Sequence, residues 1–73
     1  MTSRQHMIHD LEAGLFKGGD WFTAQLFRLI AKADSDNVKK LEEGFPVEVQ
    51  LFHEFKREGG SLFLEIHPQE VFA

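Results

Sequence analysis

The sequence predicts an all-α or mainly α fold, a small domain of three or four helices followed by an extended C-terminal arm. Apolar residues recur at every third or fourth position through most of the chain, which is the spacing of one helix face. Glycine pairs and capping residues separate these segments, and the last segment changes to strict alternation. We therefore expect helices over 5–16, 20–34, 36–43 and 46–58, and an extended arm over 61–67.

The first helix is predicted from Ile8, Leu11 and Leu15, which share one face at helical spacing. Two glycines, at positions 18 and 19, end it because they favour a turn. Asp20 follows directly and is the expected N-cap of the second helix.

The second helix is apolar on almost every side. Its main stripe, which we expect to face the core, consists of Phe22, Leu26, Leu29, Ile30 and Ala33. Neighbouring positions on a helix differ by about 100°, so Trp21 cannot face the same way as Phe22. A second, smaller stripe contains Phe27. This excess of apolar surface favours packing against another chain.

The third and fourth helices are bounded by clear signals. Asp34 opens a capping cluster that ends one helix and starts the next, and Gly44 closes the third helix. Pro46 suits the first position of the fourth helix, and Gly59–Gly60 is expected to stop it.

The arm is predicted from Leu62, Leu64 and Ile66, which alternate with other residues as in a half-buried strand. A lone strand leaves its backbone groups unpaired, and no second strand is predicted here. Its simplest partner is the same segment of a second copy. We therefore expect a homo-oligomer with these interface residues: Trp21, Phe27, Leu62, Leu64 and Ile66.

Size supports the same expectation. A chain of 73 residues has room for one domain, 1–73, and so short a domain often needs a disulfide, a metal or a partner subunit. Cysteine is absent, which excludes disulfides and thiolate zinc sites. With no signal peptide and no apolar run of membrane length, we expect the cytoplasm and no membrane partner.

Neither a metal nor another cofactor is expected. His6 and His9 are three apart on the first helix, but two ligands do not make a site. A calcium loop starting at Asp34 would need glycine and glutamate where Lys39 and Phe45 stand. Capping explains that acidic cluster.

We expect no enzyme and no catalytic residues. No pair of carboxylates falls in an apolar segment, where burial would raise one pKa for acid catalysis. The open alternative is His53, beside Glu54, as a general base, although such a histidine more often borders a helix–helix contact.

The candidate ligand-binding residues are cationic. Arg28, Lys32, Lys56 and Arg57 are the side chains expected to hold an anionic ligand, such as a phosphate-bearing nucleotide, in a pocket between subunits. The plainer interpretation is that these side chains are solvated and cover apolar neighbours. A formal charge of −4 disfavours nucleic acid, although two successive short helices leave a transcriptional regulator as the alternative.

The run from Gly19 to Asp34, with Asn37, Leu41 and Gly44–Phe45–Pro46, resembles a family of small uncharacterised bacteriophage and prophage proteins. Its pattern, F-T-x-x-L-x-x-L-I-x-K-A-D followed by G-F-P-x-E-V, covers roughly residues 18–55. The resemblance implies a phage protein in the host bacterial cytoplasm. Small phage accessory proteins often inhibit or sequester host factors in counter-defence, so we expect a non-catalytic binder of a host protein or an anionic nucleotide.

Overall fold

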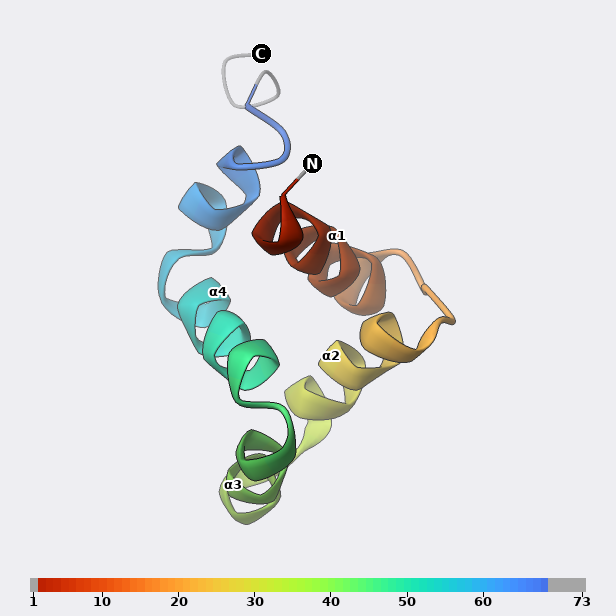
Figure 1. The fold of residues 1–73 in the computed structure, drawn as a ribbon, viewed down its shortest axis with the longest axis vertical. Coiled ribbons are helices and arrows are strands. Elements are labelled where there is room, and N and C mark those ends of the chain that lie inside the picture. Colours follow the sequence, from red (N-terminus) through yellow and green to blue (C-terminus); the bar gives the residue numbers. More distant parts are fainter. Residues whose placement is uncertain (1, 69–73) are drawn as a thin grey trace.

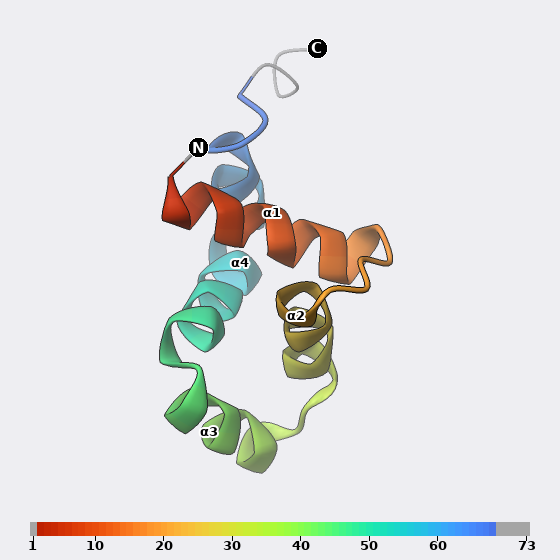
Figure 2. The same ribbon diagram turned by 45° about the vertical axis from the view of Figure 1, so that its right-hand side comes forward.

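The computed structural model describes residues 2–68, and within them it contains four helices and no strand. The helices are α1 (Ser3–Phe16), α2 (Phe22–Lys32), α3 (Ser35–Gly44) and α4 (Pro46–Leu64). The predicted all-α class is confirmed for this part of the chain. Helix α2 runs from α1 toward α3, and α4 runs back to α1, so α3 lies at the far end of the molecule (Figures 1 and 2).

Helix α1 has well-defined ends. The Thr2 side chain accepts from the Gln5 backbone N–H and the Gln5 side chain accepts from that of Thr2, which is a capping box. At the other end Gly18 adopts a positive φ of 66°, a conformation that glycine accommodates without strain. The chain then turns so that Gly19 N–H donates to the Ala13 carbonyl.

Helix α2 differs from its prediction in two ways. It begins at Phe22, with Trp21 rather than Asp20 at the N-cap position, and no side chain caps it. Its buried face is also rotated, because Phe27 is fully buried whereas Phe22 is 68% exposed and Leu29 is 52% exposed. The expected core stripe is therefore wrong at Phe22 and Leu29.

The rotation has a cause in the packing of α1 on α2. A β-carbon placed on Gly14 would lie 2.0 Å from the Ala24 carbonyl oxygen, so the two backbones are almost in contact at this point. That contact turns the Ala24 and Phe27 side of α2 inward and leaves the Phe22 and Leu29 side outward.

Helices α3 and α4 start as predicted. The Asp34 side chain accepts from the Asn37 backbone N–H at 2.9 Å, and Pro46 is the first residue of α4. However, α4 does not stop at the glycine pair: it bends at Glu58 (φ −136°, ψ 35°) and continues to Leu64.

The extended arm predicted over 61–67 is wrong. Residues through Leu64 are helical and turns follow, so residues 61–67 form no strand in this structure. The physical reason is burial: after the bend Leu62 lies in the core at 1% exposure, and Leu64 and Ile66 are half-buried. Of the domain predicted over 1–73, residues 1 and 69–73 lie outside the described part.

One core unites α1, α2 and α4. Its buried members are Ile8, Leu11, Leu26, Phe27, Ile30, Val49, Leu51, Phe52 and Leu62. Helix α3 has no buried residue, and only its half-buried Val38 and Leu41 pack against this core. In the part of the chain described, none of the helices has the length and apolar character needed to cross a membrane.

Candidate functional site

The described surface has a groove between α2 and α3, called here the α2–α3 groove. It consists of two adjoining hollows, of about 370 and 510 Å³, that share Leu29 and Leu41 as lining residues. The groove exists because α3 packs mainly on α4 and stands beside α2 without covering its outward face.

One end of the groove is apolar. It is lined by side chains of α2 and α3 and by Phe45 of the junction between α3 and α4, namely Phe22, Gln25, Leu26, Leu29, Leu41 and Phe45. The Phe22 and Phe45 rings lie 5.9 Å apart between centroids, which is within the range of aromatic contact. Phe22 and Leu29 are more than half exposed, so this end presents large apolar side chains to solvent.

The other end carries charge. Lys32 and Lys40 line it together with Asp34 and Asn37. The carboxylate of Asp34 already accepts from the backbone N–H of Asn37 as the N-cap of α3. Two lysines and one aspartate give this end of the groove a formal charge of +1.

The four cationic side chains expected to hold an anion do not line a common hollow among those described here. Arg28 is part-buried: its Nε donates to the Gly14 carbonyl at 3.0 Å and its Nη2 to the Gly19 carbonyl at 2.8 Å. Its guanidinium thus ties the turn between α1 and α2 to α2. Lys32 lines the α2–α3 groove, whereas Lys56 and Arg57 are exposed on α4 and do not line it.

Lys56 has a local contact instead. Its Nζ lies 5.9 Å from the centroid of the Phe52 ring, an approach that favours a cation over an aromatic face. Arg57 directly precedes the bend of α4 at Glu58.

The residues expected at an interface differ in their exposure. Phe27 and Leu62 are buried in the chain's own core, so neither offers a surface to a second copy in this fold. Trp21 is 44% exposed; its Nε1 donates to the Asp10 carboxylate at 2.9 Å and its ring stacks on that of His9. Its role at an interface stays a prediction.

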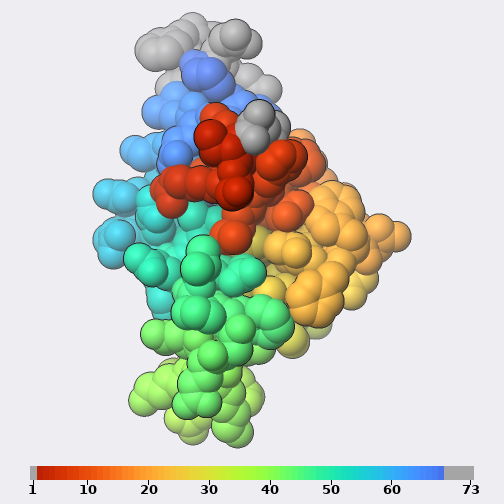
Figure 3. Space-filling view, viewed as in Figure 1, coloured from red at the N-terminus to blue at the C-terminus, as the bar shows by residue number. Residues whose placement is uncertain are grey.

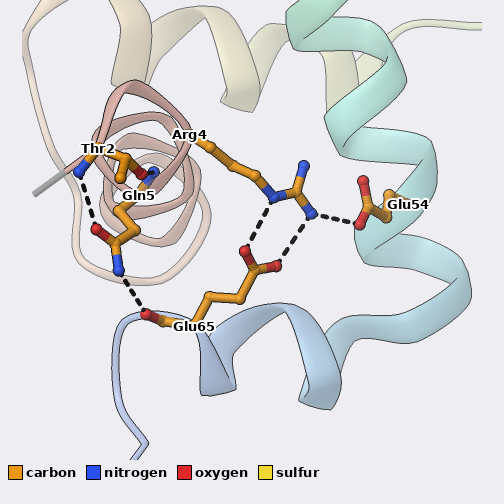
Figure 4. Close-up of polar contacts among 5 residues, drawn as sticks. All are labelled: Thr2, Arg4, Gln5, Glu54 and Glu65. Carbon is orange, nitrogen blue, oxygen red and sulfur yellow. Dashed lines mark hydrogen bonds and ion pairs between the residues drawn. The ribbon is translucent and has the colours of Figure 1, made fainter.

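A clasp of polar contacts joins the start of α1 to the end of α4 (Figure 4). Arg4 Nε and Nη2 donate to the two carboxylate oxygens of Glu65 at 2.9 and 3.0 Å, and Nη2 also donates to Glu54. Gln5 adds a bond to the Glu65 carbonyl at 3.0 Å. The hydrogen bonds from Arg4 lower the pKa of the Glu65 carboxyl.

Beside this clasp is a hollow of about 290 Å³ between α1 and α4, with Met7, Val47 and Leu51 among its lining residues. Figure 3 shows the N-terminal part of α1 lying against the end of α4 on the face in view. Arg4, the cation at the hollow, is already paired with two carboxylates, so the hollow offers little to an anion.

A second ion cluster fixes the end of the described chain. The carboxylate of Glu12, which is only 12% exposed, lies 2.9 Å from Lys17 Nζ and 2.9 Å from His67 Nε2. Burial alone would raise the pKa of Glu12, but the hydrogen bonds from Lys17 and His67 bring a net lowering. The cluster therefore holds an ionised carboxylate at the edge of the core.

The histidines show no metal arrangement. Among residues 2–68, no three His, Asp or Glu side chains come together in a way that could hold a metal ion. His53 is exposed, and its neighbour Glu54 is turned to Arg4. Glu54 lines the hollow beside the clasp, and His53, the candidate general base, is not among that hollow's lining residues.

Sequence reasoning missed Lys40, Leu41 and Phe45 as parts of a surface site. The available signal was the apolar stripe of α2 that contains Phe22 and Leu29, which was expected to face the core. Comparisons of the chain with known protein families, with curated proteins and with solved structures found no match. The resemblance to phage proteins accordingly stays a prediction.

Proposed function

We propose that this chain is a non-catalytic accessory binding protein that sequesters a host protein, and that the α2–α3 groove receives a segment of that protein. The observation that carries the proposal is the exposure of Phe22 and Leu29, two large apolar side chains on one stripe of α2. Together with the half-buried Leu41 and Phe45 they line an open hydrophobic hollow. Exposed apolar patches with a polar rim mark interaction sites.

A protein segment fits the groove better than an anionic nucleotide. A nucleotide site needs several cationic or N–H donors converging on a phosphate. Of the four cations expected for that role, Arg28 is engaged by two backbone carbonyls and only Lys32 lines the groove. The groove is dominated by apolar side chains at its Phe22 end.

The cellular location in this proposal is based on the sequence resemblance, not on the fold. The resemblance to phage and prophage proteins supports a role in the cytoplasm of a bacterial host, where a small binder acts by occupying a functional segment of its target. Nothing in that role requires the chain to carry out a reaction.

The test is selection of binding peptides from a displayed library of random helical peptides, using the full chain as bait. We expect the enriched peptides to share apolar anchors at helical spacing. They should bind Arg57→Glu as well as wild type and bind Leu29→Glu at least about tenfold more weakly. Both variants introduce a glutamate at an exposed position, but only Leu29 lines the groove. Peptides that bind the two variants equally well would contradict the proposal.

A further inference from the structure

The cationic end of the α2–α3 groove indicates what kind of segment it selects. Lys32 lies in the last turn of α2 and Lys40 on α3, and both line the hollow that continues from the apolar end through Leu29 and Leu41. Both lysines are exposed, and no ion pair within the described residues engages them. Two cations without an ion pair thus mark one end of a groove whose other end is mainly apolar.

Asp34 is the third charged group at this end of the groove, and its negative charge does not cancel the positive charges of Lys32 and Lys40. Its carboxylate is held as the N-cap of α3, and the formal balance of Lys32, Lys40 and Asp34 is positive. This local balance contrasts with a formal charge of −4 for the whole chain. An incoming segment therefore gains from carboxylates at this end and from apolar side chains at the other.

The two helices that form the groove do not supply that combination to a second copy. Helix α2, which carries the exposed Phe22 and Leu29, has the sequence FTAQLFRLIAK and contains no Asp or Glu. Helix α3 has acidic residues, but its apolar side chains Val38 and Leu41 are half-buried against the chain's own core, and Leu41 already forms part of the groove wall. Antiparallel pairing of two α3 helices would also set Lys39–Lys40 against the same pair, which is repulsive.

The form of the groove favours a helix over a small ligand. Small-molecule sites bury about 70–90% of the ligand surface, whereas the walls here include side chains that are themselves 68% and 52% exposed. Helix α2 has 11 residues and so spans about 16 Å. A partner helix of about three turns would run its length, with anchors at positions i, i+4 and i+7.

We infer, on the basis of the proposed function, that the partner segment is an amphipathic helix with apolar anchors along one face and Asp or Glu at one end. The anchors pack on Phe22, Leu29, Leu41 and Phe45, and the acidic end lies against Lys32 and Lys40. The lysines set the direction of the bound helix and discriminate against basic segments.

The test uses two helical peptides of 14 to 16 residues with leucines at i, i+4 and i+7. One ends in two glutamates and the other in two lysines at the same positions. Binding to the full wild-type chain is measured by fluorescence anisotropy, and the site is mapped by ¹H–¹⁵N spectra. We expect the acidic peptide to bind at least about tenfold more tightly, equivalent to about 1.4 kcal/mol, with shifts concentrated in residues 22–45.

The double variant Lys32→Glu/Lys40→Glu should reverse this preference, whereas Lys39→Glu/Lys56→Glu, which changes the net charge equally, should keep it. Equal binding of both peptides at residues 22–45 would overturn the inference on charge and leave the proposed function standing. Shifts outside the groove, or none with either peptide, would overturn the proposed function itself. Peptide-free dimerisation that Leu29→Glu abolishes would overturn both, because a second copy would then occupy the groove.

Discussion

Gly14 of α1 and Ala24 of α2 bring two helix backbones almost into contact, since a β-carbon on Gly14 would lie 2.0 Å from the Ala24 carbonyl oxygen. The same carbonyl group's carbon would lie 2.9 Å from that β-carbon, so no flexible side chain can move aside to relieve the overlap. This contact fixes which face of α2 is buried, and with it which face is left to the groove.

Gly14→Ala should therefore destabilise the fold although alanine favours helix formation. Separating the two helices to admit a methyl group is expected to cost about 1–3 kcal/mol, more than the gain of about 1 kcal/mol in helix propensity. Denaturant unfolding measures the difference. Gly44→Ala is the matched control because nothing lies within 4 Å of its added β-carbon; a loss of stability as large as that of Gly14→Ala would contradict this explanation.

Arg28 is expected to act in stability rather than in ligand binding. Removing its side chain leaves the carbonyls of Gly14 and Gly19 without their charged donor, and Arg28→Ala should lower the free energy of unfolding by about 1.5–3 kcal/mol. Arg28→Lys should recover only part of the loss, because an ammonium lacks the fork that reaches both carbonyls. Lys32→Ala, at an exposed position, should stay within about 0.5 kcal/mol of wild type. A fully stable Arg28→Ala would show that these bonds contribute nothing.

The two aromatic residues of α2 that changed places relative to prediction provide a direct comparison. Phe27 is fully buried and Phe22 is 68% exposed, so Phe27→Ala should cost about 3–5 kcal/mol and Phe22→Ala less than about 0.5 kcal/mol. If Phe27→Ala does not fold, Phe27→Leu, expected to cost roughly 1–2 kcal/mol, keeps the comparison measurable. Equal costs for the two positions would mean that the assigned orientation of α2 is wrong.

Stability should fall in acid through two carboxyls. The pKa of Glu65 is lowered by hydrogen bonds from Arg4, and that of Glu12 is lowered despite burial by Lys17 and His67. A carboxyl whose pKa is lower in the folded state stabilises the fold above its ordinary pKa, and that contribution disappears as pH falls through the folded value. We therefore expect the free energy of unfolding to be constant above about pH 5 and to decrease below about pH 4.

The double variant Glu12→Gln/Glu65→Gln should be less stable than wild type at pH 7 and should show a shallower decrease in acid. Its control is Glu42→Gln/Glu43→Gln, which makes the same charge change at two exposed positions of α3. Thermal unfolding between pH 3 and pH 7 measures both. An acid decrease that is as steep in Glu12→Gln/Glu65→Gln as in wild type would show that other groups cause it.

The helices were predictable because their signals are local. Periodic apolar residues, the Asp34 cap and Pro46 are read within a few positions, and the structure confirms these features. The buried face of α2 was not predictable, because both of its faces are apolar and the choice depends on how α1 packs on Ala24.

The extended arm predicted over 61–67 was wrong for a related reason. Leu62 and Ile66 alternate as in a strand, yet their separation of four also places them on one side of a helical turn. Burial of Leu62 against the core decides between the two, and burial depends on the bend at Glu58. The clasp between Arg4 and Glu65 joins residues 61 positions apart, for which the sequence contains no local signal.

The binding role of the α2–α3 groove is tested most directly by site-specific photocrosslinking in bacteria that produce the full chain. A photoreactive phenylalanine analogue is placed at position 29, inside the groove, or at position 57, which is exposed but does not line it. We predict that position 29 yields a discrete adduct with a different protein and that position 57 yields none, with the adduct lost in Lys32→Glu/Lys40→Glu. Adducts only at multiples of the 8.4 kDa chain, or the same adducts from both positions, would contradict a groove that binds a partner protein.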